Sequence, residues 1–148
     1  MSWQLKAFSD LTAIELYEIL KERTNVFVVW QNCPYLETDG KDFVSLHLYR
    51  KMDGVIVAYA RLLPPGVSFE EASIGRVLVH ADYRRQGLAA ELLDKALDVI
   101  VREKKEKAVK IQAQEYLKAF YESFGFRAVT GCYMEDGIPH INMVLQVK

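Results

Sequence analysis

The chain has 148 residues and a mass of 17.0 kDa, with 51% hydrophobic and 26% charged residues. This profile is typical of one soluble globular domain over residues 1–148, and it excludes a disordered chain and a disulfide-stapled mini-protein. With 19 Lys and Arg residues against 20 Asp and Glu, the net charge is -1, which excludes a general attraction to nucleic acid or to an anionic membrane. We therefore expect any anion-binding site to be local.

The N-terminal third predicts a strand, a helix and a loop. Trp3 to Phe8 has the composition of a short strand. Thr12 and Glu15 have the spacing of a capping box, and apolar residues recur at helical intervals, so a helix should run from Thr12 past Arg23. The segment from Gln31 to Asp42 contains Pro and Gly and predicts a loop.

The rest of the chain predicts alternating strands and helices of one α/β domain. Asp-Gly steps predict two tight turns, one at Asp53-Gly54 and one at Asp136-Gly137, and Gly125 should cap a helix. The predicted strands are Phe43 to Arg50, Val55 to Leu63, Ser73 to Val79, Ala108 to Ala113, Phe126 to Tyr133 and Ile138 to Val147. The predicted helices are Leu88 to Val101 and Glu115 to Phe124.

Cysteine content and terminal composition indicate the compartment. Cys33 and Cys132 are far apart in a chain large enough to fold without a crosslink, so we expect free thiols. Residues Met1 to Asp10 lack the pattern of a secretion signal, and no segment approaches the roughly 18 apolar residues of a membrane span. We expect a cytoplasmic protein without a membrane partner.

The segment from His80 to Ala89 joins a buried strand to an amphipathic helix and has the features of an anion site. The first N–H groups of a helix have no intrahelical acceptor and lie at the positive end of its dipole, so a loop entering that end can hold a phosphate. Gly87 permits close approach, and Arg84 and Arg85 add positive charge. The alternative is an ordinary tight turn with two solvated arginines.

Several competing chemistries lack their motifs. The chain contains neither G-x-x-x-x-G-K-[ST] nor G-x-G-x-x-G, the fingerprints of nucleoside triphosphate and dinucleotide sites. It has no H-E-x-x-H, no Cys and His residues at zinc spacing and no G-x-S-x-G elbow. We therefore expect no metal site and no serine-hydrolase chemistry.

Two motifs resemble those of the GNAT acetyltransferase superfamily. Arg84-x-x-Gly87-x-Ala89 has the form [Q/R]-x-x-G-x-[G/A] and resembles its acyl-CoA-binding motif, and Phe120-Tyr121-Glu122-Ser123-Phe124-Gly125-Phe126 resembles its second motif. Segments similar to the ElaA-like branch are Val26-Phe27-Val28-Val29, Gln31-Asn32-Cys33-Pro34-Tyr35, Ile74-Gly75-Arg76-Val77 and Glu135-Asp136-Gly137-Ile138-Pro139-His140-Ile141. The chain departs from the family pattern at Gln114, where Asn is frequent, at Leu117, where a small residue is usual, and at Trp30, where the branch places Glu.

The resemblance implies a single-domain GNAT-like α/β fold with a central mixed, mostly antiparallel sheet flanked by helices. It also implies an N-acetyltransferase that transfers acetyl from acetyl-CoA to an amine by direct attack on the thioester. The pantetheine arm would pair with a strand edge near a bulge, and the diphosphate would bind the loop before the helix. The residues implied in binding acetyl-CoA are Val77, Leu78, Val79, Arg84, Arg85, Gln86, Gly87, Leu88, Ala89 and Gln114.

The resemblance further implies that Tyr121 is the general acid that reprotonates the departing thiolate. The aromatic residues around it at helical spacing would also suit core packing alone. Because an alkylamine is protonated at neutral pH, the site also needs a route for its proton. Candidates for the base are Glu37, Glu71, Glu135 and His140. Among these, His140 lies in an ElaA-like segment, and a structural role is its alternative.

The acceptor predicted by the resemblance is a small-molecule amine or a protein amine, and a homodimer is compatible with the sequence. Two other functions stay open: a CoA-binding sensor or interaction module without turnover, and a structural α/β protein whose turn only resembles the cradle. We expect His80 to be a turn residue and His47 a surface or packing residue. Cys33 has no sequence arrangement with His that would support a nucleophilic role.

Overall fold

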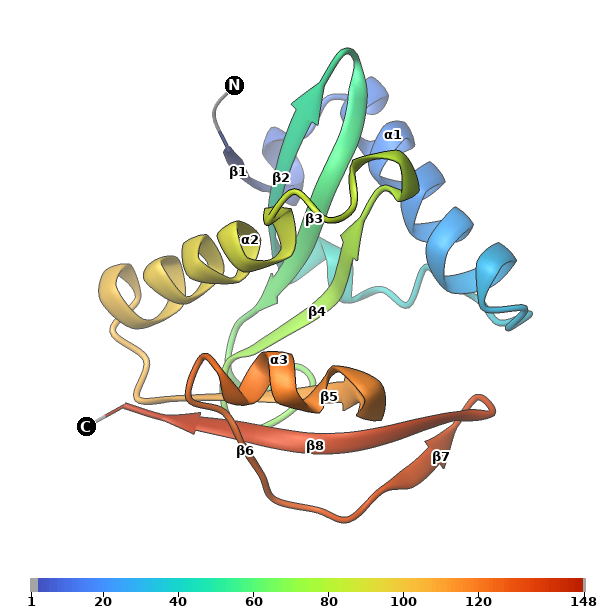
Figure 1. Ribbon diagram of the computed structural model, residues 1–148. Helices are drawn as coiled ribbons and strands as arrows, with labels where there is room; N and C mark the ends of the chain where they lie inside the picture. Colours follow the sequence, from blue (N-terminus) through green and yellow to red (C-terminus); the bar gives the residue numbers. More distant parts are fainter. Residues whose placement is uncertain (1–2, 148) are drawn as a thin grey trace.

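The computed structural model describes residues 3–147, which form two sheets of antiparallel strands (Figure 1). The first sheet has the order β1-β2-β3-β4, and the second has the order β5-β8-β6, with β7 also paired to β8. The strands are β1 (Gln4–Ala7), β2 (Leu46–Met52), β3 (Val55–Leu63), β4 (Ser73–Val79), β5 (Ala108–Gln114), β6 (Arg127–Ala128), β7 (Tyr133–Glu135) and β8 (Ile138–Gln146).

The two sheets meet at the start of β4 and β5 and separate from there. Ala72 and Val109 form an isolated parallel bridge, and the Lys110 N–H donates to the Ala72 carbonyl at 2.9 Å. Beyond this bridge no ladder joins β4 to β5 within residues 3–147, and Figure 1 shows β4 rising away from β5. The predicted mixed, mostly antiparallel α/β fold is confirmed, but its sheet is divided.

Helix α1 (Ala13–Thr24) begins at the predicted capping box. The Thr12 hydroxyl accepts from the Glu15 N–H at 3.1 Å, and the Glu15 carboxylate accepts from the Thr12 N–H at 2.8 Å. These bonds satisfy two donors that a helix start leaves free. The chain continues beyond α1 in a π-helical turn, Asn25–Trp30, which leads into the predicted loop.

Helices α1 and α2 (Leu88–Leu97) lie on opposite faces of the first sheet (Figure 1). Ile19 of α1 packs in a buried cluster with Tyr49 and Tyr59. Leu92 of α2 packs in the main core with strand residues such as Leu48. These residues alternate with Tyr49 and Tyr59 along the strands, so they lie on the other face of the sheet. A π-helical turn, Asp98–Glu103, extends α2, so the predicted helix from Leu88 to Val101 is confirmed.

Helix α3 (Lys118–Glu122) is shorter than the predicted helix from Glu115 to Phe124, because Glu115–Leu117 form a 3-10 turn instead. The predicted cap is confirmed, since Gly125 has a φ of 100°. A Cβ at Gly125 would lie 2.9 Å from the Leu145 Cδ1, so only glycine fits there without displacing a core side chain.

Both Asp-Gly turns are confirmed, with positive φ at Asp53, Gly54, Asp136 and Gly137. The predicted start of the first hairpin strand at Phe43 was wrong, because residues Lys41–Val44 form a 3-10 turn and β2 begins only at Leu46. The Ser45 hydroxyl donates to the Lys41 carbonyl at 2.7 Å and holds this turn closed.

The predicted strand from Phe126 to Tyr133 was also wrong as a single strand. It is divided into β6 and β7, because Thr130 replaces a ladder bond: its hydroxyl accepts from the Asn142 N–H at 3.1 Å. The segment from Gly131 to Cys132 then leaves the sheet. Finally, no helix within residues 3–147 is long and apolar enough to cross a membrane.

Candidate active site

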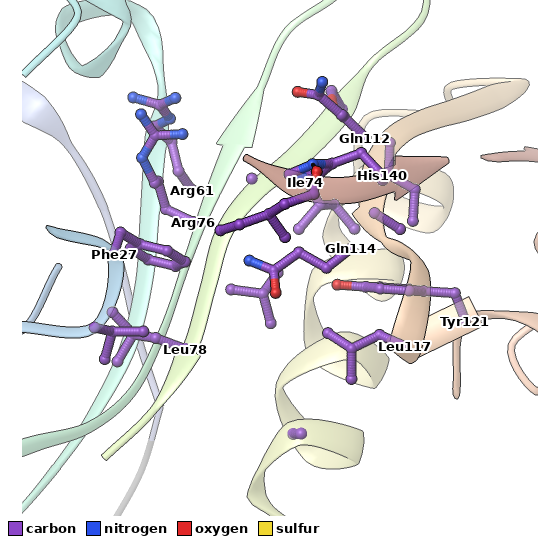
Figure 2. A pocket seen from close by; sticks show the side chains of 18 of the residues that line it. Phe27, Arg61, Ile74, Arg76, Leu78, Gln112, Gln114, Leu117, Tyr121 and His140 are labelled. Atoms are coloured by element: carbon purple, nitrogen blue, oxygen red, sulfur yellow. Dashed lines mark hydrogen bonds between the residues drawn. The ribbon is translucent and has the colours of Figure 1, made fainter. Parts of the chain in front are cut away.

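The divided sheet contains an open cavity of about 1040 Å³ between the diverging ends of β4 and β5. Figure 2 shows side chains that reach it from both sides. Phe27, Arg61, Arg76 and Leu78 come from the π-helical turn and the first sheet. From the other side come Gln112, Gln114 and His140 of the second sheet, Leu117 of the 3-10 turn after β5, and Tyr121 of α3.

A bulge in β4 opens this cavity. Tyr59 pairs with Leu78 and Arg61 pairs with Gly75, so Arg76 and Val77 both lie opposite a single residue of β3. Arg76 has a φ of 52°, which bends the strand at a residue other than glycine. The predicted bulge is therefore present, and Val77, Leu78 and Val79 line the cavity beyond it. Their strand edge toward β5 has no partner strand within residues 3–147.

The loop before α2 presents backbone donors to the same cavity. Gly87 is the residue before the first turn of α2, with a φ of 77°, and no side chain caps the helix start. Arg85 also has a positive φ, 65°. A Cβ at Gly87 would meet no atom within 4 Å, so the approach to these N–H groups is open. Such a helix start attracts anions.

The predicted loop residues do not all reach the cavity. Arg84, Arg85, Gly87, Leu88 and Ala89 line it, together with Ala90. Gln86 is exposed and is not among the lining residues. Its backbone is part of the loop, but its side chain has no contact with the cavity.

Arg84, which lines the cavity, contacts Trp30, which does not. Its guanidinium carbon lies over the Trp30 ring, 4.9 Å from the ring centre, and its Nε–H donates to the Val79 carbonyl at 3.4 Å. Trp30 is the last residue of the π-helical turn and is 49% exposed. No local pattern predicts that Trp30 lies beside the loop from Arg84 to Gly87, which we call the anion loop.

Tyr121 is buried at the back of the cavity, at 5% exposure. Its ring packs edge-on against Phe120 and Phe126, while its hydroxyl points into the cavity (Figure 2) and has no hydrogen-bond partner within residues 3–147. Burial raises the pKa of Tyr121 to about 12, and Tyr116 adds to the rise. The phenol therefore stays protonated at neutral pH, the form that can donate.

Gln114 and His140 face each other in the second sheet, where they are paired residues of β5 and β8. The Nδ1 of His140 lies 2.7 Å from the Ile138 carbonyl, which can only accept, so Nδ1 carries the proton. The unprotonated nitrogen of the neutral ring is then Nε2. The ring also stacks on Tyr133 at 6.4 Å between ring centres.

The cavity brings together only some of the predicted bases. Glu135 and His140 line it, whereas Glu71 and Glu37 do not. Glu37 is buried, and its Oε2 accepts from the Nε–H groups of Arg23 and Arg76 at 2.8 and 2.7 Å. The Glu37 carboxylate is therefore engaged by two guanidinium groups and does not face the cavity.

An ion-pair cluster under the end of the cavity away from the anion loop was not predicted from the sequence. The Arg23 NH1 donates to Asp42 at 2.7 Å, and the Arg61 NH1 donates to Asp42 at 3.0 Å and to Asp39 at 2.8 Å. Arg23 is fully buried and Arg61 is 3% exposed. Arg61 could have indicated such a cluster, because it is a charged residue inside an otherwise apolar strand and so needs buried partners.

The remaining histidine residues, His47 and His80, are a packing residue and a turn residue. His47 is fully buried and accepts from the Tyr59 hydroxyl through Nδ1 at 2.7 Å, and burial lowers its pKa. His80 begins a 3-10 turn and accepts from the Asp82 N–H, as expected of a turn residue. Both cysteines are free, as predicted.

Comparison with known proteins agrees with this geometry. The family described as acetyltransferase (GNAT) domain matches residues 37–147. An acyl-CoA N-acyltransferase from Pseudomonas aeruginosa is 44% identical and has a TM-score of 0.92, with 97% of this chain and 98% of that chain covered.

Two further relatives are similar over nearly the whole chain. Escherichia coli ElaA is 39% identical, with a TM-score of 0.92 and coverage of 98% of this chain and 99% of that chain. A UPF0039 protein of Schizosaccharomyces pombe is 42% identical over 144 residues, which is 96% of this chain and 95% of the relative. The chain therefore belongs to the GNAT acetyltransferase family of acyl-CoA-dependent acyltransferases, in its ElaA-like branch.

Proposed function

We propose that the chain, as one domain over residues 1–148, transfers an acetyl group from acetyl-CoA to the amine of a small molecule or a protein. Membership of the GNAT family supports acyl transfer from CoA, and the description of the Pseudomonas aeruginosa relative as an N-acyltransferase supports an amine acceptor. Acetyl-CoA supplies an activated thioester, and transfer to an amine forms an amide and releases the CoA thiol.

The cavity has features that fit a long, anionic cosubstrate. The uncapped start of α2 and the open approach at Gly87 suit the diphosphate. The unpaired edge of β4 at Val77 to Val79 suits the amide groups of a pantetheine arm, which can bond to it as an added strand would. Gln114, at the end of β5, offers a side-chain amide from the opposite wall.

Tyr121 is our proposed general acid. Its hydroxyl faces the cavity without a protein partner, and its raised pKa keeps the proton on the phenol until a thiolate develops nearby. Its rigid aromatic surroundings fix the position of the hydroxyl, which favours donation in one geometry. The packing around Tyr121 thus supports the proposed role and does not compete with it.

His140 is our proposed base, acting on the acceptor amine directly or through water. The Ile138 carbonyl fixes the tautomer with a free lone pair on Nε2. Glu135, which lies on the other strand of the same hairpin, also lines the cavity and supplies a negative charge that favours an alkylammonium acceptor.

The observation that carries the proposal is the convergence of three features on one cavity: an open helix start, a free strand edge and a buried phenol that faces them. The test is incubation with acetyl-CoA and a panel of amines that includes a polyamine, an amino sugar, an amino acid and a lysine peptide. We expect thiol release and a product heavier by one acetyl group for one class of amine.

Calorimetry with CoA separates the alternatives. Binding of CoA without turnover of any amine would favour the sensor or interaction module. Failure to bind either CoA or acetyl-CoA would contradict the proposed function altogether.

The variant His140→Gln tests the assignment of the base. Gln keeps a polar side chain but has no basic nitrogen, so kcat should fall by about 100-fold or more, the usual contribution of a positioned base. The loss should shrink at high pH, where more of the acceptor amine is already neutral. A pH–rate profile unchanged from that of the wild type would assign His140 a structural role.

A further inference from the structure

Trp30 has a position that the proposed chemistry does not explain. It ends the π-helical turn, remains 49% exposed, and lies over the guanidinium of Arg84 at 4.9 Å from the ring centre. Arg84 belongs to the loop before α2 and lines the cavity, whereas Trp30 itself is not among the lining residues. Trp30 therefore contacts the anion loop from outside the cavity.

The contacts of Arg84 leave part of its guanidinium unpaired. Its Nε–H donates to the Val79 carbonyl at 3.4 Å, while its terminal NH groups have no partner within residues 3–147. No carboxylate within those residues forms an ion pair with it. An aromatic face attracts the cation without using its N–H donors, so those donors stay available to an anion.

Arg84 has a long, exposed side chain, which would populate many rotamers without these contacts. Ordering such a side chain on binding costs entropy, and a contact already made in the free protein reduces that cost. The Val79 carbonyl accepts from Nε at 3.4 Å and the Trp30 ring lies against the guanidinium, so two contacts from different elements restrict the side chain.

We propose that Trp30 is a positioning residue for cosubstrate binding: it holds Arg84 beside the start of α2 with its terminal N–H groups directed to the diphosphate of CoA. This inference rests on the proposed function, because it requires CoA in the loop before α2. Trp30 is suited to this task because a carboxylate at the same place would pair with Arg84 and repel the phosphates.

The experiment is a double-mutant cycle on CoA affinity, measured by calorimetry. Trp30→Ala should weaken CoA binding about two- to fivefold, the range of an exposed cation–π contact. Trp30→Phe should restore part of the loss, since it keeps an aromatic face. Trp30→Glu should weaken binding more than Trp30→Ala, and raised salt should reduce the difference between them.

The Arg84→Ala background gives the decisive comparison. If Trp30 acts through Arg84, Trp30→Ala should have no further effect on CoA affinity once Arg84 is replaced. Val29→Ala is the matched control, since Val29 is 61% exposed on the same helical turn and should leave affinity unchanged. Thermal unfolding of each variant checks that the fold is retained, and Trp30→Phe serves if Trp30→Ala does not fold.

The outcomes separate the two proposals. Equal CoA affinity in the wild type and Trp30→Ala overturns the role of Trp30 alone, as does a Trp30→Ala effect of undiminished size in the Arg84→Ala background. A wild type that does not bind CoA overturns the proposed function and this inference with it.

Discussion

The two ends of the cavity differ in how their charges are compensated. At the anion loop, Arg84 and Arg85 have no carboxylate partner within residues 3–147, and the start of α2 has no side-chain cap. At the opposite end, Arg23, Arg61 and Arg76 are all bound by carboxylates of the loop before β2. Unpaired donors indicate a surface that a ligand completes, whereas paired ones indicate a rigid support.

The ion-pair cluster explains how a long loop can form one wall of a cavity. The Glu37 carboxylate joins Arg23 of α1, Arg76 of the β4 bulge and the Tyr35 hydroxyl, all within 2.8 Å. Arg76 also lies near the rings of Phe27 and Tyr35. Because several elements contribute to each contact, the loop is held in one conformation without regular secondary structure.

The largest effect is expected for Tyr121→Phe, which tests whether the end with unpaired donors is catalytic. Loss of a general acid should slow the chemical step by about 100- to 10,000-fold, or roughly 3 to 5 kcal/mol of transition-state stabilisation. Affinity for acetyl-CoA should change little, because the ring and its packing are kept. Single-turnover measurements with saturating acetyl-CoA would isolate that step from product release.

The control for Tyr121→Phe is Tyr17→Phe, which removes an exposed phenol from α1. It should react at the wild-type rate. If Tyr121→Phe also does so, the buried tyrosine serves packing and the acid lies elsewhere.

Arg23→Met tests whether the opposite end is a rigid support. Removing this buried guanidinium leaves Glu37 and Asp42 without one of their cations, so the free energy of unfolding should fall by about 3 to 5 kcal/mol. Urea denaturation would measure the loss. The control is Arg127→Met on β6, where the side chain is exposed and the change should be small. Equal stability of the two variants would argue against a supporting role.

Gly87→Glu tests whether the anion loop binds phosphate groups. The carboxylate would occupy the open approach to the helix start and repel the diphosphate, so CoA affinity should fall about tenfold or more, or roughly 1.4 kcal/mol. Calorimetry on the folded variant measures the change.

A matched control for Gly87→Glu is available in the chain. Gly54→Glu adds the same charge at a glycine with nearly the same φ, 76° against 77°, and equally open surroundings in the β2–β3 turn. It therefore carries the same backbone strain outside the cavity. If both variants bind CoA equally well, the loop is not the phosphate site.

The anion-loop end of the cavity could be predicted from the sequence because its determinants are contiguous. The strand, Gly87 and the helix follow one another, so a short motif specifies where the backbone donors lie. The capping box at Thr12 and the Asp-Gly turns are similarly local. The direction of the Tyr121 hydroxyl could not be predicted from local sequence, because it depends on how α3 packs.

The end with the ion pairs could not be predicted, because its contacts join residues far apart in the chain. Arg23 meets Asp42 across 19 positions, and Arg76 meets Glu37 across 39. Charged residues in a loop are usually solvated, so nothing local indicates that these are buried. The break after β6 could not be predicted for the same reason, because it depends on a distant residue: the Thr130 hydroxyl accepts the Asn142 N–H of β8 in place of a backbone carbonyl.

The smallest expected effect is the pH dependence of stability that Asp39 confers. Burial alone would raise the pKa of Asp39, but hydrogen bonds from Arg61 and from the Lys41 N–H outweigh it and lower the pKa to about 2. The same side chain in the unfolded chain titrates at about 3.9. Because the folded pKa is the lower one, this carboxylate stabilises the fold fully above about pH 4, and the contribution is lost as the pH falls toward 2.

Asp39→Asn should therefore have a lower Tm than the wild type at pH 7, and the gap should close between about pH 4 and pH 2, where the wild-type carboxylate takes up its proton. Thermal unfolding across this range measures the gap. The control is Asp53→Asn in the β2–β3 turn, an exposed acid without an ion pair in the described part of the chain. A gap for Asp39→Asn that stays constant from pH 7 to pH 2 would mean that the charge of the Asp39 carboxylate does not stabilise the loop before β2.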